Sequence, residues 1–214
     1  MLENSGDRVG WGYGHGSCRQ CRYCLRGDEL YCPQRKIYGE SSLDQGSFAH
    51  AAVFPEDFLY KIPDGLTNAE VAPLMCAGSA VFSPLHKFKV APTDRVGVIG
   101  VGGWAIWPFS SLRRWPLDHL LVTSAAQPNW DAVFRIMAPG GSIYALTVDM
   151  VEMRFPYLPV VMKGLRIQGS LPAARGSQRE MLQFAVRHSI KPIEAMESLM
   201  QGKMRYRGVL VHDV

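Results

Sequence analysis

The sequence predicts an α/β protein in which a strand-rich N-terminal part precedes a parallel sheet covered by helices. Three observations support this fold class. Four of the five cysteines fall within residues 18–32, which marks a metal-binding loop. A glycine-rich turn follows a short apolar strand at residues 96–105. From residue 117 onwards, apolar strands alternate with helical segments, as in a parallel sheet buried on both faces.

The composition is that of a globular chain. Its 214 residues suffice for one large domain or two modest ones, and 47% of them are apolar. The net charge of +4 gives no reason to expect nucleic acid or a membrane as a partner. No apolar run is long enough to span a membrane, and no signal peptide is visible. The cysteine spacing favours a reducing compartment, so we expect a cytoplasmic protein.

The first 66 residues contain short alternating stretches. They predict strands at residues 7–14, 46–54 and 59–62, followed by a turn at 63–65. Thr67 and Glu70 have the spacing of a capping box, which opens a helix that we expect to run through residues 69–78.

The cysteine loop is the strongest local signal. Two residues separate each of the first three cysteines, and seven residues, including Gly27, precede the fourth; the set is Cys18, Cys21, Cys24 and Cys32. Thiolates at this spacing suit a tetrahedral zinc ion. The alternative is two disulfides, but a bridge from Cys18 to Cys21 would close a strained small loop. Four protein ligands leave no open position, so the predicted zinc is structural. His15 is interpreted as a loop residue and not as a fifth ligand.

A phosphate-binding loop is the second signal. An apolar strand at residues 96–99 is followed by Gly100, Gly102 and Ala105, which have the spacing G-x-G-x-x-G/A of a dinucleotide-binding turn. Such a turn brings backbone amides and a helix N-terminus to a pyrophosphate. The alternative is an ordinary glycine turn between packed elements.

The segment after this turn departs from the motif. A crossover helix and a second strand should follow, yet Pro108 would stop a helix within a turn of its start. Three tryptophans lie in this short stretch, at positions 104, 107 and 115. A strand is predicted again at residues 119–123, so only about 15 residues stand where a βαβ unit needs roughly 30.

The remaining elements follow a regular order. Strands are predicted at residues 119–123, 142–146, 165–170 and 207–211, and helices at 130–137, 158–164, 178–188 and 193–202. A turn is predicted at residues 139–141, and Gly164 should end the second of these helices.

Together these segments resemble the medium-chain, zinc-dependent alcohol dehydrogenases. The four-cysteine loop is similar to their structural zinc loop, and residues 73–78 resemble the segment that brings a catalytic zinc ligand. Residues 100–105 resemble their nucleotide loop. Residues 138–141, 167–171 and 202–211 resemble later segments of the same family. The most similar branch is the cinnamyl-alcohol-dehydrogenase-like, NADP-preferring one.

The resemblance implies a fold and an activity. It implies an incomplete GroES-like β-rich catalytic domain over residues 1–78, an incomplete Rossmann-type doubly wound sheet over 79–170, and a return to the catalytic domain over 171–214. The implied reaction is hydride transfer between NADP or NAD and a small alcohol or aldehyde, with zinc as Lewis acid. Members of this family are often homodimers.

The resemblance also implies roles for individual residues. The four loop cysteines would hold the structural zinc, and Cys76 would be one ligand of the catalytic zinc. Gly100, Gly102 and Ala105 would hold the pyrophosphate. Thr123 and Ser170 would lie near the nicotinamide or its ribose, and Arg207 near a cofactor phosphate. The alternative for Cys76 is a small buried apolar residue in a packed helix.

Three departures from the family predict impaired catalysis. The family's first cysteine ligand and its histidine ligand have no counterpart in this sequence, although a catalytic zinc needs three protein ligands. The region that selects NAD or NADP is missing between Ala105 and Leu117. Residues 188–196 join two segments that the family separates. The remaining sheet would lack a strand pair and expose apolar faces, which favours aggregation.

Two other hypotheses remain. The chain would be a non-enzymatic, zinc-stapled interaction protein if the basic residues around the loop form a binding patch; these are Arg19, Arg22, Arg26, Arg35 and Lys36. Alternatively, it would be a fragment from a mis-spliced transcript or an incorrectly assembled gene.

Overall fold

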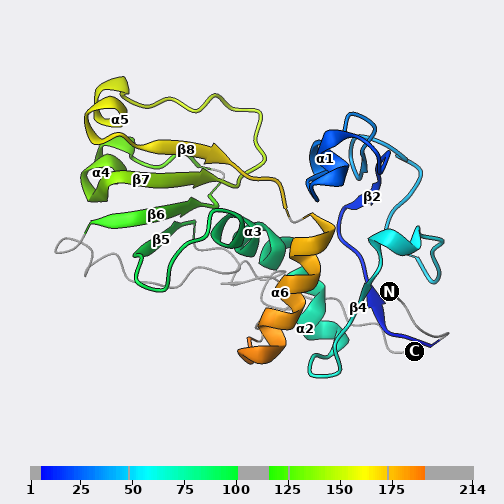
Figure 1. Cartoon of the computed structure of the whole chain (residues 1–214). Helices are drawn as coiled ribbons and strands as arrows, with labels where there is room; N and C mark the ends of the chain where they lie inside the picture. The colour runs from blue at the N-terminus through cyan, green and yellow to red at the C-terminus, as the bar shows by residue number, and fades with distance from the viewer. Residues whose placement is uncertain (1–5, 48, 101–115, 125, 173, 191–214) are drawn as a thin grey trace, which may run out of the picture. The chain divides into compact units, whose positions relative to one another are not determined.

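The computed structural model of the chain describes residues 6–47, 49–100, 116–124, 126–172 and 174–190 (Figure 1). These residues form two compact units. The cysteine-loop unit comprises residues 6–83 and 172–190, and the parallel-sheet unit comprises residues 84–171. The predicted helix at 193–202, the predicted strand at 207–211 and the segment 104–115 lie outside the described residues. No described helix has both the length and the apolar character needed to cross a membrane.

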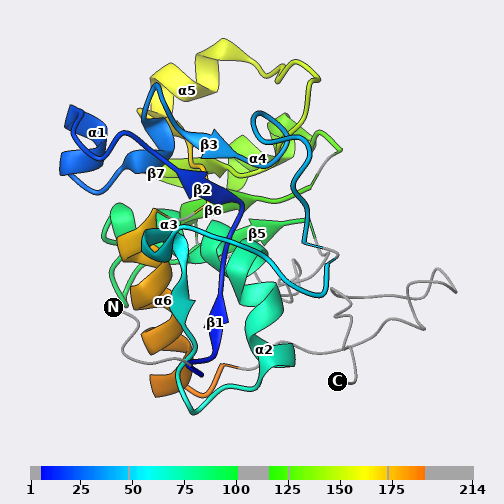
Figure 2. The ribbon, with the colours of Figure 1, turned by 90° about the vertical axis from the view of Figure 1, so that its right-hand side faces the viewer.

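The cysteine-loop unit contains two small antiparallel sheets. Strand β1 (Val9–Gly10) pairs with β4 (Tyr60–Lys61), and β2 (Gly14–Gly16) pairs with β3 (Lys36–Ile37), as Figure 2 shows for the second pair. In the chain, α1 (Arg22–Leu25) and the 3₁₀ turn η1 (Glu29–Tyr31) lie between β2 and β3. A second 3₁₀ turn, η2 (Glu56–Phe58), lies between β3 and β4. Each strand is only two or three residues long, so the sheets alone supply little stability.

The strand predicted at residues 46–54 is wrong. Residues 46–47 and 49–54 form neither helix nor strand, and Val53 is 97% exposed. An alternating pattern becomes a strand only where a sheet can pair with it and bury one of its faces. Here the apolar residues at positions 49, 51 and 53 all remain exposed.

The predicted capping box is confirmed. Thr67 Oγ1 accepts a hydrogen bond from the Glu70 backbone N–H at 3.2 Å, and Glu70 Oε2 accepts from the Thr67 N–H at 2.8 Å. The box opens α2 (Asn68–Pro73), which continues through a π-helical turn, η3 (Leu74–Gly78), into α3 (Ser79–Lys87). The wider turn follows Pro73, which has no N–H to donate inside the helix. The helix predicted at 69–78 is therefore longer and interrupted.

The parallel-sheet unit is built on four parallel strands in chain order (Figure 1). They are β5 (Val96–Ile99), β6 (Leu117–Val122), β7 (Met137–Ala145) and β8 (Arg166–Gly169). The connections contain α4 (Trp130–Ile136) and α5 (Tyr157–Lys163). The core is formed by buried apolar side chains, among them Leu117, Leu120, Val122, Trp130, Val133, Phe134, Met137 and Ile143. The prediction of an α/β fold with a parallel sheet is confirmed.

Three helix ends in this unit follow from local chemistry. Asn129 Oδ1 accepts a hydrogen bond from the Ala132 N–H at 3.1 Å and caps the start of α4. Lys163 Nζ donates to the carbonyls of Phe134 and Met137 at 2.6 and 2.9 Å, next to the end of α4. Gly164 adopts a left-handed conformation, with φ of 60°, and ends α5 as predicted. In the cysteine-loop unit, α6 (Arg175–Arg187) begins three positions before the predicted Gln178.

The turn predicted at residues 139–141 is wrong. Strand β7 passes through these residues without interruption. Leu117 pairs with Met137 and His119 pairs with Ser142, so two steps along β6 correspond to five along β7. Gly140, with φ of 77°, accommodates the extra residues as a bulge. The proline and glycines thus mark a distortion within a strand.

Gly100 provides a test of packing in the parallel-sheet unit. Its φ is 102°, and an added Cβ would lie 2.5 Å from the backbone N of Ser124, which cannot move aside. We expect Gly100→Ala to lower the free energy of unfolding by about 3 kcal/mol or more, because strain and a backbone clash add together. Urea denaturation measures this change.

Gly164→Ala is the matched control. Gly164 also has a positive φ, but nothing lies within 4 Å of an added Cβ. Its cost should be about 1 kcal/mol, from backbone strain alone. Equal losses for the two variants would contradict the close packing of Gly100 on β6.

Candidate functional site

The cysteine loop runs from the end of β2 to Cys32. Cys21 stands at the N-terminus of α1, Cys24 lies within it, and Cys32 follows η1 directly. Gly27, with φ of 81°, reverses the chain after α1, and its N–H donates to the Cys24 carbonyl at 3.1 Å. A residue with a Cβ would be strained at this φ. The chain therefore turns back at Gly27, where the sequence predicted that it would close the loop.

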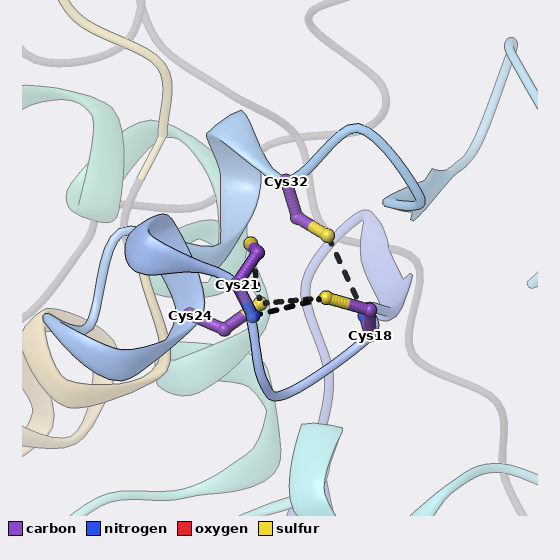
Figure 3. Close-up of side chains that lie close together, drawn as sticks. All are labelled: Cys18, Cys21, Cys24 and Cys32. Atoms are coloured by element: carbon purple, nitrogen blue, oxygen red, sulfur yellow. Dashed lines mark hydrogen bonds between the residues drawn. The ribbon is translucent and has the colours of Figure 1, made fainter.

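The four cysteine side chains point toward one another (Figure 3). Their sulfur atoms all lie within 4.8 Å of one another, and none forms a disulfide. Cys24 Sγ is 3.6 Å from Cys21 Sγ and 3.9 Å from Cys18 Sγ. A tetrahedral zinc with Zn–S bonds of about 2.3 Å requires sulfur separations of about 3.8 Å. The donor set therefore fits a closed zinc site with four protein ligands.

Backbone N–H groups support negative charge on two of the sulfurs. Cys18 Sγ accepts from the Cys21 N–H at 3.3 Å, and Cys32 Sγ accepts from the N–H groups of Cys18 and Gln34 at 3.4 and 3.3 Å. Hydrogen bonds from the backbone of Gln20 and Cys21 lower the pKa of Cys18 to about 6. Burial raises the pKa of Cys24 to about 11. A bound cation would favour the thiolate at Cys24 as well.

The basic side chains around the loop have local partners. Arg19 pairs with Asp57 at 2.8 Å, Arg26 with Asp28 at 3.2 Å, and Arg35 with Glu40 at 2.8 Å. The guanidinium of Arg22 lies 4.7 Å from the centre of the Tyr23 ring. Carboxylates therefore partly neutralise three of the five basic residues of the hypothesised patch, Arg19, Arg26 and Arg35.

His15 differs from the sequence interpretation. It lies in β2, not in a loop, and it is buried. Its Nε2 is 3.2 Å from Ser42 Oγ, and its ring lies 5.2 Å from that of Tyr38. The glycines on either side, Gly14 and Gly16, hid the strand from a reading of sequence patterns, since glycine is rare in strands.

Cys76 lies apart from the four-cysteine cluster, in the π-helical turn η3. Its side chain is exposed, so the alternative of a buried apolar residue is wrong. Its carbonyl accepts a hydrogen bond from Ser79 Oγ at 2.8 Å. Within the described residues, the four loop cysteines are the only group of three or more potential metal ligands. The role of Cys76 as a ligand of the catalytic zinc stays a prediction.

The predicted nucleotide loop begins where β5 ends. Gly100 packs against the backbone of Thr123 and Ser124, and Thr123 Oγ1 donates to the carbonyls of Gly100 and Ile99 at 2.8 and 3.0 Å. The Thr123 hydroxyl therefore ties the end of β6 to the end of β5. Gly102, Ala105 and Arg207 lie outside the described residues.

Thr123 and Ser170 both lie at the carboxyl edge of the sheet. Ser170 follows β8, and its N–H donates to the Ala145 carbonyl at 3.4 Å. A cavity of about 170 Å³ lies at the same edge, lined by residues that follow β6 and β7, among them Ser124, Gln127, Thr147 and Asp149. Ligands of open parallel sheets bind at this edge. The four described strands of this sheet are parallel and lie side by side in chain order.

Glu29 is a buried polar residue that the sequence analysis did not single out. It lies in η1, between Cys24 and Cys32, and its carboxylate contacts Arg175 at the start of α6. These residues are far apart in the sequence and no local pattern links them. Only the folded structure identifies this pair.

Comparison with known proteins extends these observations. Residues 3–64 match the model of the alcohol dehydrogenase GroES-like domain. The chain is 26% identical to an alcohol dehydrogenase from Geobacillus stearothermophilus, over 96% of this chain and 75% of that protein. It is 31% identical to a probable cinnamyl alcohol dehydrogenase 8B from Oryza sativa subsp. japonica, over 96% of this chain and 60% of that protein.

A solved structure has the same fold. It is the CAD from Helicobacter pylori, complexed with NADP(H), with a TM-score of 0.80 and 20% identity. The match covers 96% of this chain and 75% of that one. The predictions of a GroES-like domain and of a medium-chain dehydrogenase fold are confirmed.

Alkylation by iodoacetamide tests the loop. As long as the metal-free loop keeps its folded geometry, we expect the rate at Cys18 to rise with pH and to reach half its plateau near pH 6, because the thiolate forms as the pH passes its lowered pKa. Cys24, which is buried and has a pKa raised to about 11, should stay unreactive below about pH 9. Peptide mass spectrometry measures both rates.

Saturation with zinc provides the control. It should protect all four loop cysteines and leave Cys76 reactive, since Cys76 is exposed and outside the cluster. Equal rates at Cys18 and Cys24 without metal would contradict the loop geometry.

Proposed function

We propose that the chain is a member of the medium-chain alcohol dehydrogenase family, and that it is a zinc-binding, NADP(H)-linked alcohol or aldehyde oxidoreductase with impaired catalysis. The observation that carries the class of reaction is its similarity to alcohol dehydrogenases along 96% of its length. This similarity supports the oxidoreductase class; the metal, the cofactor and the impairment are the finer parts of the proposal.

The four loop cysteines would hold a structural zinc. Their mutual sulfur distances and the backbone N–H groups directed at Cys18 and Cys32 support this assignment. All four tetrahedral positions would be filled by protein, so this metal would have no site for substrate or water. Its contribution is to the fold of the loop.

Cys76 would be a remnant of the catalytic zinc site. A zinc ion there would polarise the substrate oxygen during hydride transfer. Three protein ligands are needed to hold such an ion. Cys76 has the exposure that a ligand facing substrate requires, but it belongs to no group of three potential ligands within the described ranges. This is the basis for proposing that catalysis is impaired.

The parallel-sheet unit would bind the cofactor. Gly100 would let backbone amides approach the pyrophosphate together with Gly102 and Ala105. Thr123 and Ser170 would lie near the nicotinamide or its ribose, and Arg207 near a phosphate. The position of Thr123 and Ser170 at the carboxyl edge supports this arrangement. The choice of NADP(H) over NAD rests on the sequence resemblance to the NADP-preferring branch of the family. The domain boundaries at residues 78 and 170 and a cytoplasmic location are part of the same proposal.

A homodimer is the proposed assembly. The parallel-sheet unit exposes apolar side chains along α5: Leu158 is 69% exposed and Met162 75% exposed. These two residues are four positions apart and so share one helix face, which Tyr157 and Val161 extend. Monomers rarely expose such a continuous apolar face. A second copy of the chain would cover it.

Metal content and turnover test the proposed activity. We expect one zinc per chain, and NADPH-dependent reduction of cinnamaldehyde at least about a hundredfold slower than that of a relative with a complete catalytic site. Plasma emission spectroscopy and the loss of NADPH absorbance measure these quantities. Cys76→Ser should leave the zinc content unchanged, whereas Cys24→Ser should reduce it. Two zinc ions per chain together with ordinary turnover would overturn the impairment.

Light scattering tests the dimer. We expect the double change Leu158→Glu and Met162→Glu to shift the chain from dimer to monomer at micromolar concentration, because each carboxylate would be buried against the other copy. Leu43→Glu is the control, since Leu43 is 81% exposed and lies in the cysteine-loop unit. A wild-type monomer, or a dimer that survives the double change, would refute the proposed surface.

A further inference from the structure

Helix α6 begins without a cap of its own. Ala174, at its N-terminus, has no side chain that can accept a hydrogen bond, and the first turn contains no acidic residue. The first four N–H groups of a helix need partners from outside it. A 13-residue helix such as α6 also carries a partial positive charge at this end.

Glu29 supplies the missing cap from the cysteine loop. Its Oε1 accepts a hydrogen bond from the Arg175 backbone N–H at 2.5 Å. The Arg175 Nε lies 3.4 Å from the same oxygen, and its Nη1 lies 3.5 Å from Asp57 Oδ2. The guanidinium also lies over the Phe58 ring, 5.2 Å from its centre. The Glu29 carboxylate thus contacts both the first backbone N–H of α6 and the side chain of Arg175, the first residue of that helix.

The burial of Glu29 makes this contact costly to lose. The residue is only 2% exposed. A buried carboxylate is strongly unfavourable without hydrogen bonds and an opposite charge. Burial, and after it the negative charge of Glu29, raises the pKa of the neighbouring Tyr60 to about 12.

The cysteine loop fixes the position of Glu29. The residue begins η1, and its carbonyl accepts the hydrogen bond of the Cys32 N–H at 3.0 Å. Cys24 precedes it and Cys32 follows it, and both are ligands of the proposed zinc site. Without a metal, only weak contacts to sulfur would hold these ligands together. Glu29 would then lose the geometry that lets it reach α6.

The same helix reaches the segment that carries Cys76. Gln178, one turn into α6, donates from Nε2 to the Leu74 carbonyl at 3.4 Å. Its Nε2 also lies 3.5 Å from Met75 Sδ. Leu74 and Met75 both belong to the π-helical turn η3. The first turn of α6 therefore lies between the cysteine loop and η3.

We propose that Glu29 links metal binding in the cysteine loop to the formation of the first turn of α6. The metal-bound loop then stabilises the first turn of this helix, in addition to stabilising its own fold. Linkage of this kind is reciprocal, so the contact between Glu29 and α6 also strengthens metal binding. The inference requires that the loop binds zinc, but it does not depend on catalytic activity.

Hydrogen exchange of the wild-type chain is the first test. Removing zinc with a chelator should accelerate exchange of the amides at residues 175–178 at least about tenfold. Amides of α4, in the parallel-sheet unit, should keep their protection. Unchanged exchange at the start of α6 after complete zinc removal would overturn the proposal. A loop that takes up no zinc at all would overturn it too.

Zinc release from variants is the second test. Glu29→Gln removes the charge while keeping the shape, and we expect zinc transfer to a colorimetric chelator to become about tenfold faster. Glu40→Gln is the matched control, because Glu40 is an exposed carboxylate paired with Arg35 near the same loop. It should release zinc at the wild-type rate. In zinc-loaded Glu29→Gln, the amide of Arg175 should also exchange faster than in wild type. Equal release rates for the two variants would refute the linkage.

Discussion

The convergence of four cysteine sulfurs is the constraint on which the cysteine-loop unit depends. Four thiolates less than 5 Å apart would repel one another strongly, and the three backbone N–H groups directed at Cys18 and Cys32 would offset only part of that repulsion. A divalent cation turns the repulsion into attraction. The dependence is marked here because the strands of this unit are two or three residues long. Two-stranded sheets of that size are marginal without further support.

The parallel-sheet unit obtains its stability differently. Its core packs apolar side chains from β6, β7 and α4 around Ile143 and Leu120, which are fully buried. No described residue in that core is a metal ligand. Hydrophobic burial supplies its main driving force, at roughly 25 cal/mol per Å². The two units should therefore respond differently to chelators, although one chain forms both.

Sequence patterns succeeded where the interactions are local. The spacing of the four cysteines, the Thr67–Glu70 capping box and Gly164 at the end of α5 each depend on residues close in the chain, and the structure contains all three. Sequence patterns gave wrong predictions where a residue or strand distant in the sequence determines the local structure. The alternating apolar residues at 46–54 form no strand, because no sheet pairs with them and buries one face. Gly140 and Gly141 form a bulge within β7, because pairing with β6 continues on both sides of them. The Glu29–Arg175 pair joins residues 146 positions apart, which no local pattern can reveal.

The four clustered cysteines and Cys76 lie in different elements of the chain. A zinc bound by four thiolates has no open position, so it can shape the fold but cannot touch a substrate. Cys76 is exposed on a π-helical turn, a rare conformation that often marks a functional position. Gln178 of α6 holds the Leu74 carbonyl at the start of that turn, and the first turn of α6 is itself held by Glu29. The structural metal would thus act on the Cys76 segment through a helix and two hydrogen bonds. A zinc held by the four loop cysteines would therefore support the fold independently of any catalytic activity.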